Sequence, residues 1–141
     1  SKYDAVVISD FNKGFLSEDD IKVISLKHSM VFLDTKKKLG PWCNNVVYIK
    51  INKDEYEATK GEITDIIYDK LIITLGVEGA QHNDITYSVP KVEIKDTSGA
   101  GDTFISGLVV KYIGTKDIEE SIRFANECAT KVVQKRGVNT T

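Results

Sequence analysis

Four short apolar runs, each followed by a polar residue or a glycine, constrain the fold most strongly. Runs of this length without alternation are typical of strands that are buried on both faces of a parallel sheet. Helix-like segments lie between several of them, so the order β-α-β-β-α-β predicts an α/β fold with a mainly parallel sheet flanked by helices. Such sheets place ligands at the carboxyl ends of their strands. The predicted strands are 3–9, 30–33, 46–51 and 71–75.

Local signals predict where the helices begin and end. Ser17 is followed by three acidic residues, which is typical of an N-cap with a favourably charged first turn. It predicts a helix that runs to about Lys27, with His28 at its end. A short helix over 53–57 and a second helical piece over 63–68 are expected between the third and fourth strands.

The chain changes its pattern after Gly76. The pair Asn83-Asp84 between two short apolar runs predicts a β-hairpin with a tight turn, and His82 is expected to be an exposed strand residue. An apolar segment over 92–94 leads into a glycine-containing loop and a helix, for which Gly114 is the expected C-cap.

Composition excludes several functional classes. The 141 residues carry 19 basic and 21 acidic side chains, a balance that gives no electrostatic footprint for nucleic acid or a membrane surface. Cys43 and Cys128 follow no metal-ligand spacing, so free thiols in a reducing, cytoplasmic compartment are expected. The length suits one domain, and the start at Ser1 without Met suggests a piece of a longer protein. The favoured interpretation of the basic run Lys36-Lys37-Lys38 is a solvated loop.

The glycine-containing loop over 96–103, DTSGAGDT, opens directly into a helix-period apolar run. Free backbone N–H groups at a helix start, at the positive end of the helix dipole, form an anion site. Asp102 stands in the first turn of that predicted helix. Because it adds negative charge beside any bound phosphate, it is either a capping acid or a base.

Three phosphate-loop chemistries compete for this loop. The Walker pattern GxxxxGK[ST] is absent, which excludes a P-loop nucleotidase. A dinucleotide fingerprint needs a third glycine, but Phe104 stands there, and the acids about twenty residues on, Glu119 and Glu120, lie inside a predicted helix. The remaining interpretation is phosphoryl transfer to an alcohol, in which the loop stabilises developing charge and a carboxylate takes the hydroxyl proton.

The stretch DTSGAGDTF at 96–104 resembles the signature of the ribokinase/PfkB-type carbohydrate kinases. Three other stretches agree with that family in the right order: NKDE at 52–55 with its NxxE element, TLGVEG at 74–79 with its TLGxxG element, and FAN at 124–126 with Gly137. The resemblance implies a ribokinase-like fold and a kinase that uses ATP and Mg²⁺ to phosphorylate a sugar or sugar phosphate.

Within the family, SDFNKG at 9–14 and DTK at 34–36 look most like the heptose-7-phosphate kinase branch of ADP-heptose synthesis. Two positions depart from that branch. Thr35 stands where proline is common, and Phe11 stands where tyrosine is frequent.

The resemblance implies a catalytic role for the glycine loop. Asp102 corresponds to the base that deprotonates the sugar hydroxyl, and the backbone N–H groups of Gly99, Ala100 and Gly101 correspond to the anion hole. The alternative for Asp102 is an acid that only caps the helix, and the alternative for Gly99 to Gly101 is an ordinary glycine turn.

The resemblance also implies a metal site and a nucleotide site. Asn52 and Glu55 would organise Mg²⁺ and its waters, although NxxE at a helix start is by itself only a capping arrangement. The nucleotide would contact Thr74, Gly76, Gly79, Asn126 and Lys36. The structural alternative for Asn126 is a buried, hydrogen-bonded amide, and that for Lys36 is a solvated side chain.

Three further expectations follow from the resemblance. Lys13 is another candidate phosphate contact, and the alternative is that it is only a solvated side chain. A monovalent cation would bind near Asp96 and Gly137. The chain matches only the C-terminal, nucleotide-binding portion of such a kinase over 1–141, so the part that supplies the sugar site is not found in it. We therefore expect nucleotide binding without a complete acceptor site. The alternative is a non-catalytic nucleotide-binding or truncated module that associates through an exposed sheet edge along 3–9. A homo-oligomer is a separate expectation.

Overall fold

The computed structural model describes residues 5–91 and 99–138, with side chains up to 134. These residues belong to two compact units, one comprising 1–75 with 81–85 and the other 76–80 with 86–141.

The first unit contains a parallel sheet. Its strands are β1 (Val6–Asp10), β2 (Val31–Thr35), β3 (Tyr48–Asn52) and β4 (Leu71–Thr74), each parallel to the next. The predicted parallel arrangement of these four segments is therefore confirmed. The complete sheet has the strand order β1-β2-β3-β4-β5-β6, so β1 is an edge strand and, in the described part of the chain, pairs only with β2, as the edge prediction for 3–9 requires.

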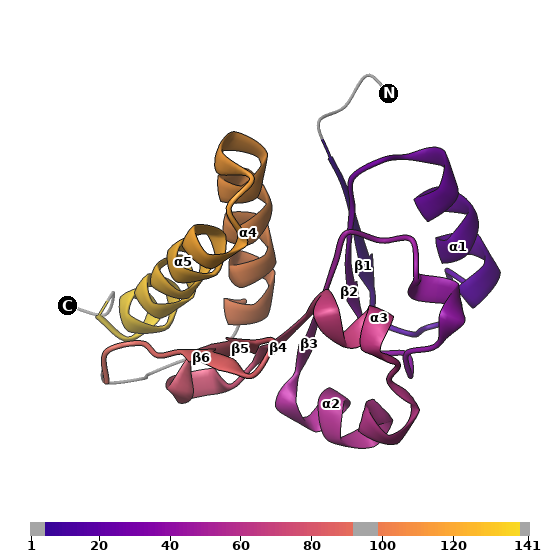
Figure 1. Cartoon of the computed structure of the whole chain (residues 1–141). Coiled ribbons are helices and arrows are strands. Elements are labelled where there is room, and N and C mark those ends of the chain that lie inside the picture. The colour runs from indigo at the N-terminus through magenta and orange to yellow at the C-terminus, as the bar shows by residue number, and fades with distance from the viewer. Residues whose placement is uncertain (1–4, 92–98, 139–141) are drawn as a thin grey trace. The chain divides into compact units, whose positions relative to one another are not determined.

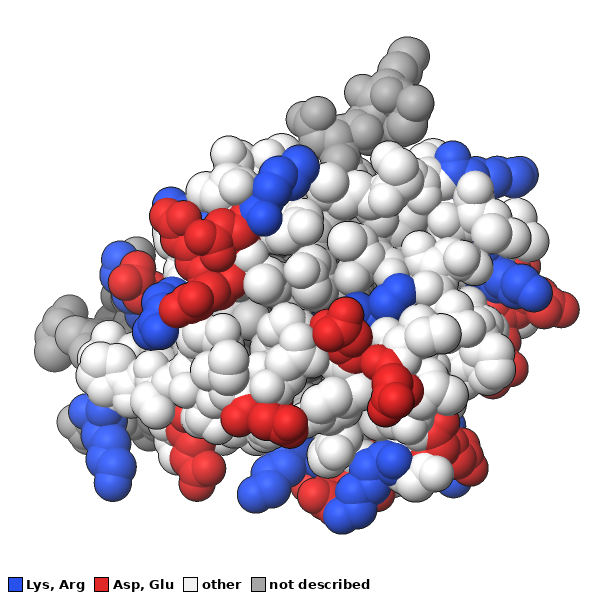
Figure 2. Space-filling view, viewed as in Figure 1, with Lys and Arg blue, Asp and Glu red and all other residues white. Residues whose placement is uncertain are grey.

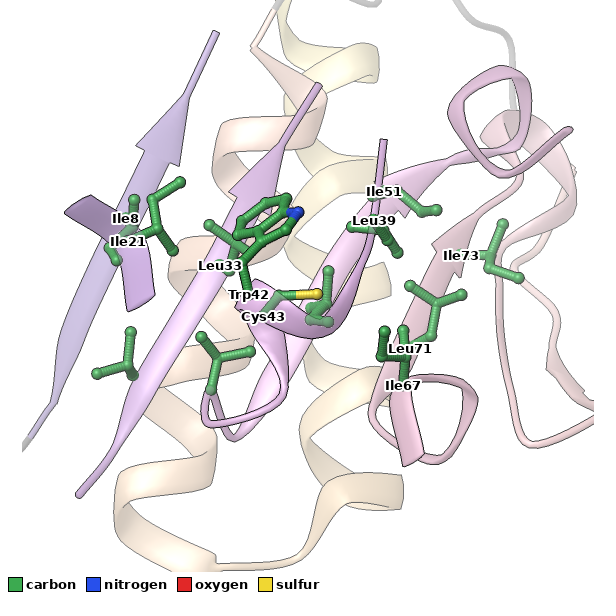
Figure 3. Close-up of a cluster of buried hydrophobic side chains, with 13 residues drawn as sticks. Ile8, Ile21, Leu33, Leu39, Trp42, Cys43, Ile51, Ile67, Leu71 and Ile73 are labelled. Atoms are coloured by element: carbon green, nitrogen blue, oxygen red, sulfur yellow. The ribbon is translucent and has the colours of Figure 1, made fainter. Parts of the chain in front are cut away.

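One face of this sheet forms the core of the first unit (Figure 3). Because side chains alternate along a strand, the paired residues Ile8 and Leu33 project from the same face as Ile49 and Leu71 in the following strands. Helix α1 (Glu18–Lys27) adds the fully buried Ile21. The short 3-10 segment η1 (Pro41–Cys43) contributes buried Trp42 and Cys43 to the same cluster.

Helix boundaries in the first unit follow the local signals. The Ser17 hydroxyl accepts the Asp20 N–H and the Asp20 carboxylate accepts the Ser17 N–H, so the predicted start of α1 is confirmed as a complete capping box. His28 is the C-cap residue, as expected. The third strand leads into α2 (Lys53–Thr59), η2 (Lys60–Glu62) and α3 (Asp65–Asp69).

The predicted hairpin is present as β5 (Ala80–His82) and β6 (Ile85–Tyr87). Asn83 and Asp84 have φ values of 50° and 67°, the left-handed pair that a two-residue hairpin turn of type I′ requires. The expectation for His82 is wrong, because its side chain is buried. Its ring lies edge-on to Tyr48 and its Nε2 is 2.8 Å from the carbonyl oxygen of Asp69.

The second unit contains η3 (Gly76–Glu78) and two helices that pack on each other, α4 (Ala100–Thr115) and α5 (Ile118–Val138) (Figure 1). A Cβ on Gly107 of α4 would lie 3.2 Å from the Cys128 sulfur of α5, so a larger side chain would crowd this contact. The expected end of α4 is wrong, since the helix continues through Gly114. Lys116 instead adopts the left-handed conformation, with φ of 57°, and its backbone N–H donates a hydrogen bond to the Tyr112 carbonyl oxygen.

The segment over 92–94 lies outside the described residues. No helix in the described part is long and apolar enough to cross a membrane. Acidic and basic side chains are interspersed on the face seen in Figure 2, in keeping with the balanced charge of the sequence.

Candidate functional site

The carboxyl ends of the four parallel strands are polar. Asp10, Thr35, Asn52 and Thr74 are the last residues of β1 to β4 in that order. Asp10 is paired in register with Thr35, and Asn52 with Thr74. Because parallel strands end at the same edge of a sheet, these residues mark the position where open α/β sheets bind ligands.

A buried charge cluster stands at the end of β1. The Asp10 carboxylate accepts the Thr35 hydroxyl at 2.8 Å and the Asn12 N–H at 3.0 Å, and the Lys37 ammonium lies 2.8 Å from its Oδ2. Burial by itself would raise the pKa of Asp10. The hydrogen bonds from Lys37, Thr35 and Asn12 outweigh burial, and the net pKa is lowered.

Lys37 joins two loops. Besides Asp10 it contacts the Asn12 Oδ1 at 3.1 Å, and Asn12 itself has a left-handed φ of 58°. Its side chain is only 10% exposed, so the interpretation of the basic run as a solvated loop fails for this member. Sequence reasoning missed Asp10 and Lys37 as a pair. The available signal was an acidic residue directly after one buried strand and a lysine shortly after the next.

Asn52 and Glu55 form a reciprocal cap on α2. The Asn52 side chain accepts the Glu55 N–H, and Glu55 Oε1 accepts the Asn52 N–H, both at 2.8 Å. The capping interpretation of NxxE is thus present in the structure. The second carboxylate oxygen, Glu55 Oε2, lies 3.0 Å from the Lys36 ammonium.

These two residues fit magnesium in a limited way. Glu55 Oε2 already faces a cation, and Asn52 supplies an oxygen of the type that Mg²⁺ accepts. The part of the chain that is described contains no group of three or more His, Cys, Asp or Glu side chains suited to a metal. A bound Mg²⁺ would therefore keep several waters or take phosphate oxygens, which is its usual preference.

Thr74 and the glycines after it have different surroundings. The Thr74 hydroxyl is 3.4 Å from the Ile51 carbonyl oxygen, in the first unit. Gly76, in the second unit, has a φ of 62° and nothing within 4 Å of the position that a Cβ would take, which leaves open space for a ligand. Gly79 differs, because its Cβ would lie 2.0 Å from the Tyr87 carbonyl oxygen. The glycine at 79 is required by the chain's own backbone.

Asn126 lies on α5 and is buried. Its side-chain NH₂ donates to the Tyr87 carbonyl oxygen at 2.9 Å, so it ties this helix to the end of β6. The guanidinium of Arg123 lies 5.1 Å from the centre of the Tyr87 ring and supports the same junction. Asn126 is therefore a buried, hydrogen-bonded asparagine, as the structural alternative expected, and one of its amide hydrogens is already donated to Tyr87.

The glycine loop enters α4 as a helix start without a side-chain cap. Gly99 is the N-cap with a left-handed φ of 79°, and the N–H groups of the first turn, from Ala100 to Asp102, have no partner within the helix. Asp102 is exposed in that first turn. The cation site proposed near Asp96 and Gly137 lies outside the described residues and side chains.

The structure groups the candidate residues by unit. Lys36, Asn52 and Glu55 come together in the first unit through the contacts given above. Gly99, Ala100, Gly101 and Asp102 are consecutive at the start of α4 in the second unit. Lys13 is exposed on the loop after β1.

These features define a class of protein. A parallel sheet with polar carboxyl ends and a glycine turn that opens a helix with free N–H groups are typical of α/β proteins that bind phosphate-bearing ligands. The sequence pattern of the pfkB family carbohydrate kinases matches residues 29–141. The chain belongs to that family, as the resemblance predicted.

Individual relatives agree with this assignment. The "Bifunctional protein HldE" of Sulfurimonas denitrificans is 34% identical over 99% of this chain, and that of Nitratiruptor is 30% identical over 99%. This chain covers 34% of the length of each. It thus spans about a third of these curated relatives.

Solved structures agree with the fold. The nucleoside kinase of Methanocaldococcus jannaschii, an archaeal member of the ribokinase family, superposes with a TM-score of 0.71 at 23% identity, over 97% of this chain and 52% of that one. The aminoimidazole riboside kinase of Salmonella enterica, complexed with aminoimidazole riboside and an ATP analog, also gives 0.71, at 20% identity, over 92% and 56%. The predicted ribokinase-like α/β fold is confirmed.

Proposed function

We propose that this chain is the nucleotide-binding portion, 1–141, of a sugar kinase that transfers the γ-phosphoryl group of ATP to a hydroxyl of a sugar or sugar phosphate. The observation that carries the proposal is an exposed carboxylate, Asp102, directly after the left-handed Gly99 turn in the first turn of α4. Membership of the pfkB family and the relatives named HldE support it. A heptose phosphate is the acceptor that the motif resemblance favours.

The proposed mechanism divides the work within α4. The N–H groups at Gly99, Ala100 and Gly101, at the positive end of a 16-residue helix, stabilise the negative charge that develops on the transferring phosphoryl group. Asp102 accepts the proton of the attacking hydroxyl. The Asp102 side chain is exposed, which leaves its carboxylate accessible to the attacking hydroxyl.

The metal and the nucleotide are assigned to other residues. Magnesium, when bound, would neutralise phosphate charge, and Asn52 with Glu55 would hold it through their oxygens and its waters. We assign Thr74, Gly76 and Lys36 to direct nucleotide contact. Gly79 and Asn126 act indirectly, because a side chain at 79 would collide with the Tyr87 carbonyl oxygen and the Asn126 amide donates to it.

The base assignment is tested by Asp102→Asn in a protein that covers the full length of the relatives. Loss of the proton acceptor should lower kcat by about 10²–10⁴-fold with ATP affinity changed by less than about threefold. Asp117→Asn is the control, because Asp117 is also an exposed acid at a helix start; it directly precedes α5, and its carboxylate accepts the Glu120 N–H. An unchanged kcat for Asp102→Asn sinks the assignment.

The second candidate is a non-catalytic module that binds nucleotide and associates through β1. It is favoured by the position of β1 at the sheet edge and by the 43% exposure of Val7 on that strand. Calorimetry of the 141-residue chain with ATP and Mg²⁺, beside sedimentation analysis, separates the two. Nucleotide heat without turnover, turnover only in a full-length protein, and a monomeric chain would support the kinase portion. A stable homo-oligomer without any turnover in either protein would support the module.

A further inference from the structure

The Tyr87 carbonyl oxygen is approached from two sides within the second unit. The Asn126 side-chain NH₂, on α5, donates to it at 2.9 Å. A Cβ at Gly79 would lie 2.0 Å from the same oxygen and 3.1 Å from the Ser88 Cα, so the Gly79 backbone packs directly on this part of the chain. The position of Tyr87 therefore decides where Gly79 can lie.

The Tyr87 side chain is held separately, and from the same helix. The residue is only 4% exposed. The Arg123 guanidinium lies 5.1 Å from the centre of the ring, within the range of a cation–π interaction. Arg123 also pairs with Glu119 at 3.2 Å, one turn earlier on α5. Because positions three apart are neighbours on a helix, Arg123 and Asn126 hold Tyr87 from one face of α5, by its ring and by its carbonyl.

The turn that packs on Tyr87 carries the open glycine. The Gly79 N–H donates to the Gly76 carbonyl oxygen at 3.1 Å and closes the turn around η3. Gly76 has open space at the position that a Cβ would take, whereas Gly79 has none. Because the turn is closed by its own hydrogen bond, a shift of Gly79 carries Gly76 with it.

Helix α5 gives this arrangement a fixed support. A Cβ on Gly107 of α4 would lie 3.4 Å from the Ala125 Cα and 3.2 Å from the Cys128 sulfur of α5. These two α5 residues stand on either side of Asn126 in the sequence. The close approach of the two helices therefore leaves the backbone at Asn126 little freedom to move.

We propose that Arg123 and Asn126 are positioning residues for nucleotide binding: they set the place of the Gly76–Gly79 turn through Tyr87 and do not touch the nucleotide themselves. The proposal rests on the proposed function, which assigns Gly76 to nucleotide contact. Loss of either hold lets Tyr87 shift, and the turn shifts with it. Nucleotides with different bases should then be weakened alike, because neither side chain reads the base.

The first experiment changes the exposed member of the pair. Calorimetry measures the binding of ATP and of inosine triphosphate, each with Mg²⁺, to the 141-residue chain. Arg123→Met should weaken both nucleotides about two- to fivefold, because it removes the cation from the Tyr87 ring. Arg123→Lys keeps a cation within reach of the ring and should retain most of the affinity.

Lys111→Met is the matched control. The Lys111 ammonium lies 5.3 Å from the centre of the Phe124 ring and 3.6 Å from Glu120, in the same helix pair. The substitution therefore removes the same charge, a cation–π contact and an ion pair, but none of them involves Tyr87. Equal weakening by Lys111→Met and Arg123→Met would mean that only the general positive charge matters, and the proposal is then wrong.

The second experiment removes the buried amide. Asn126→Leu keeps a similar volume without the donor to the Tyr87 carbonyl, and should weaken ATP and inosine triphosphate alike, by about fivefold or more. Combined with Arg123→Met, its effect should be smaller than the product of the two single effects, because both act through Tyr87. A loss for ATP alone would mean that Asn126 reads the adenine amino group, which overturns the proposal.

A purely structural role gives a different result. A variant that lowers the Tm but binds ATP as the wild type does, with unchanged amide chemical shifts for Gly76 and Gly79, contradicts the positioning role. The Arg123 side chain is 61% exposed, so Arg123→Met is expected to fold and decides the question even if Asn126→Leu does not.

The failures of the two proposals can be told apart. If the wild-type chain binds neither ATP nor inosine triphosphate, the proposed function fails and the positioning role falls with it. If the wild type binds both and the Arg123→Met and Asn126→Leu variants bind them equally well, the function stands and the positioning role alone is overturned.

Discussion

The Lys37 ammonium, on the loop after β2, lies 2.8 Å from the buried carboxylate of Asp10, the last residue of β1. The preceding residue, Lys36, reaches instead to Glu55. Two neighbours in one basic run therefore have opposite tasks. Lys37 is buried against the carboxyl edge of the sheet, whereas the Lys36 side chain is 51% exposed and pairs with Glu55.

We expect Lys37→Met to lower the free energy of unfolding by about 2–4 kcal/mol, because it leaves the Asp10 carboxylate buried without its cation. Lys36→Met is the matched control and should cost less than about 1 kcal/mol, as an exposed pair does. Urea denaturation measures both. Similar losses for the two variants would show that Lys37 is not a structural anchor.

The pKa of Asp10 predicts a dependence of stability on pH. Its folded-state pKa is lowered from the ordinary 3.8, so the ionised form is favoured by folding. The contribution is fully present above pH 3.8 and is lost as the pH falls through the lower folded value. The difference in unfolding free energy between the wild type and Asp10→Asn should shrink on acidification below about pH 4. A difference that is constant down to about pH 2 would contradict the assignment.

The contact between Tyr68 and Asp84 predicts an alkaline effect. The phenol donates to the Asp84 carboxylate, and this bond, aided by burial, raises the pKa of Tyr68 to about 12 from 10.0. A raised pKa means that the protonated phenol is favoured by folding, so the contribution is complete below pH 10.0 and lost as the pH rises through about 12. Absorbance titration near 295 nm should show one tyrosine that ionises late, and Asp84→Asn should return it toward the others.

Gly76 and Gly79 should separate a ligand position from a structural one. Gly79→Ala forces a Cβ to within 2.0 Å of the Tyr87 carbonyl oxygen at a φ of +102°, so we expect a loss of more than about 3 kcal/mol in stability. Gly76→Ala meets open space and should cost about 1 kcal/mol for its positive φ. If ATP contacts Gly76, that variant should nonetheless lose nucleotide affinity, which calorimetry measures.

Much of the fold could be predicted because its signals are local. The N-cap at Ser17 and the turn at Asn83-Asp84 depend on residues within three or four positions, and both were found as predicted. The end of α4 was missed for a related reason. Gly114 is a good C-cap by residue type, but it remained in the helix and Lys116 took the left-handed conformation.

The candidate site was less predictable because its contacts join distant parts of the chain. His82 was expected to be exposed, but it packs against Tyr48 and the Asp69 carbonyl. The spacing of residues in a hairpin does not indicate which distant residues the His82 side chain will contact. For the same reason the sequence motif led us to assign Gly79 to a ligand contact. The structure shows that the Tyr87 backbone already requires a residue without a side chain at this position.

By itself the sequence determined the strand segments, most of the helix caps and the family, since hydrophobic runs, capping residues and the DTSGAGDTF motif are written in consecutive positions. Only the tertiary structure decided that Lys37 belongs to Asp10 and Lys36 to Glu55, across separations of 27 and 19 residues. An ammonium on a long side chain can reach several carboxylates, and which one it meets depends on how the loops after parallel strands converge at the edge of the sheet.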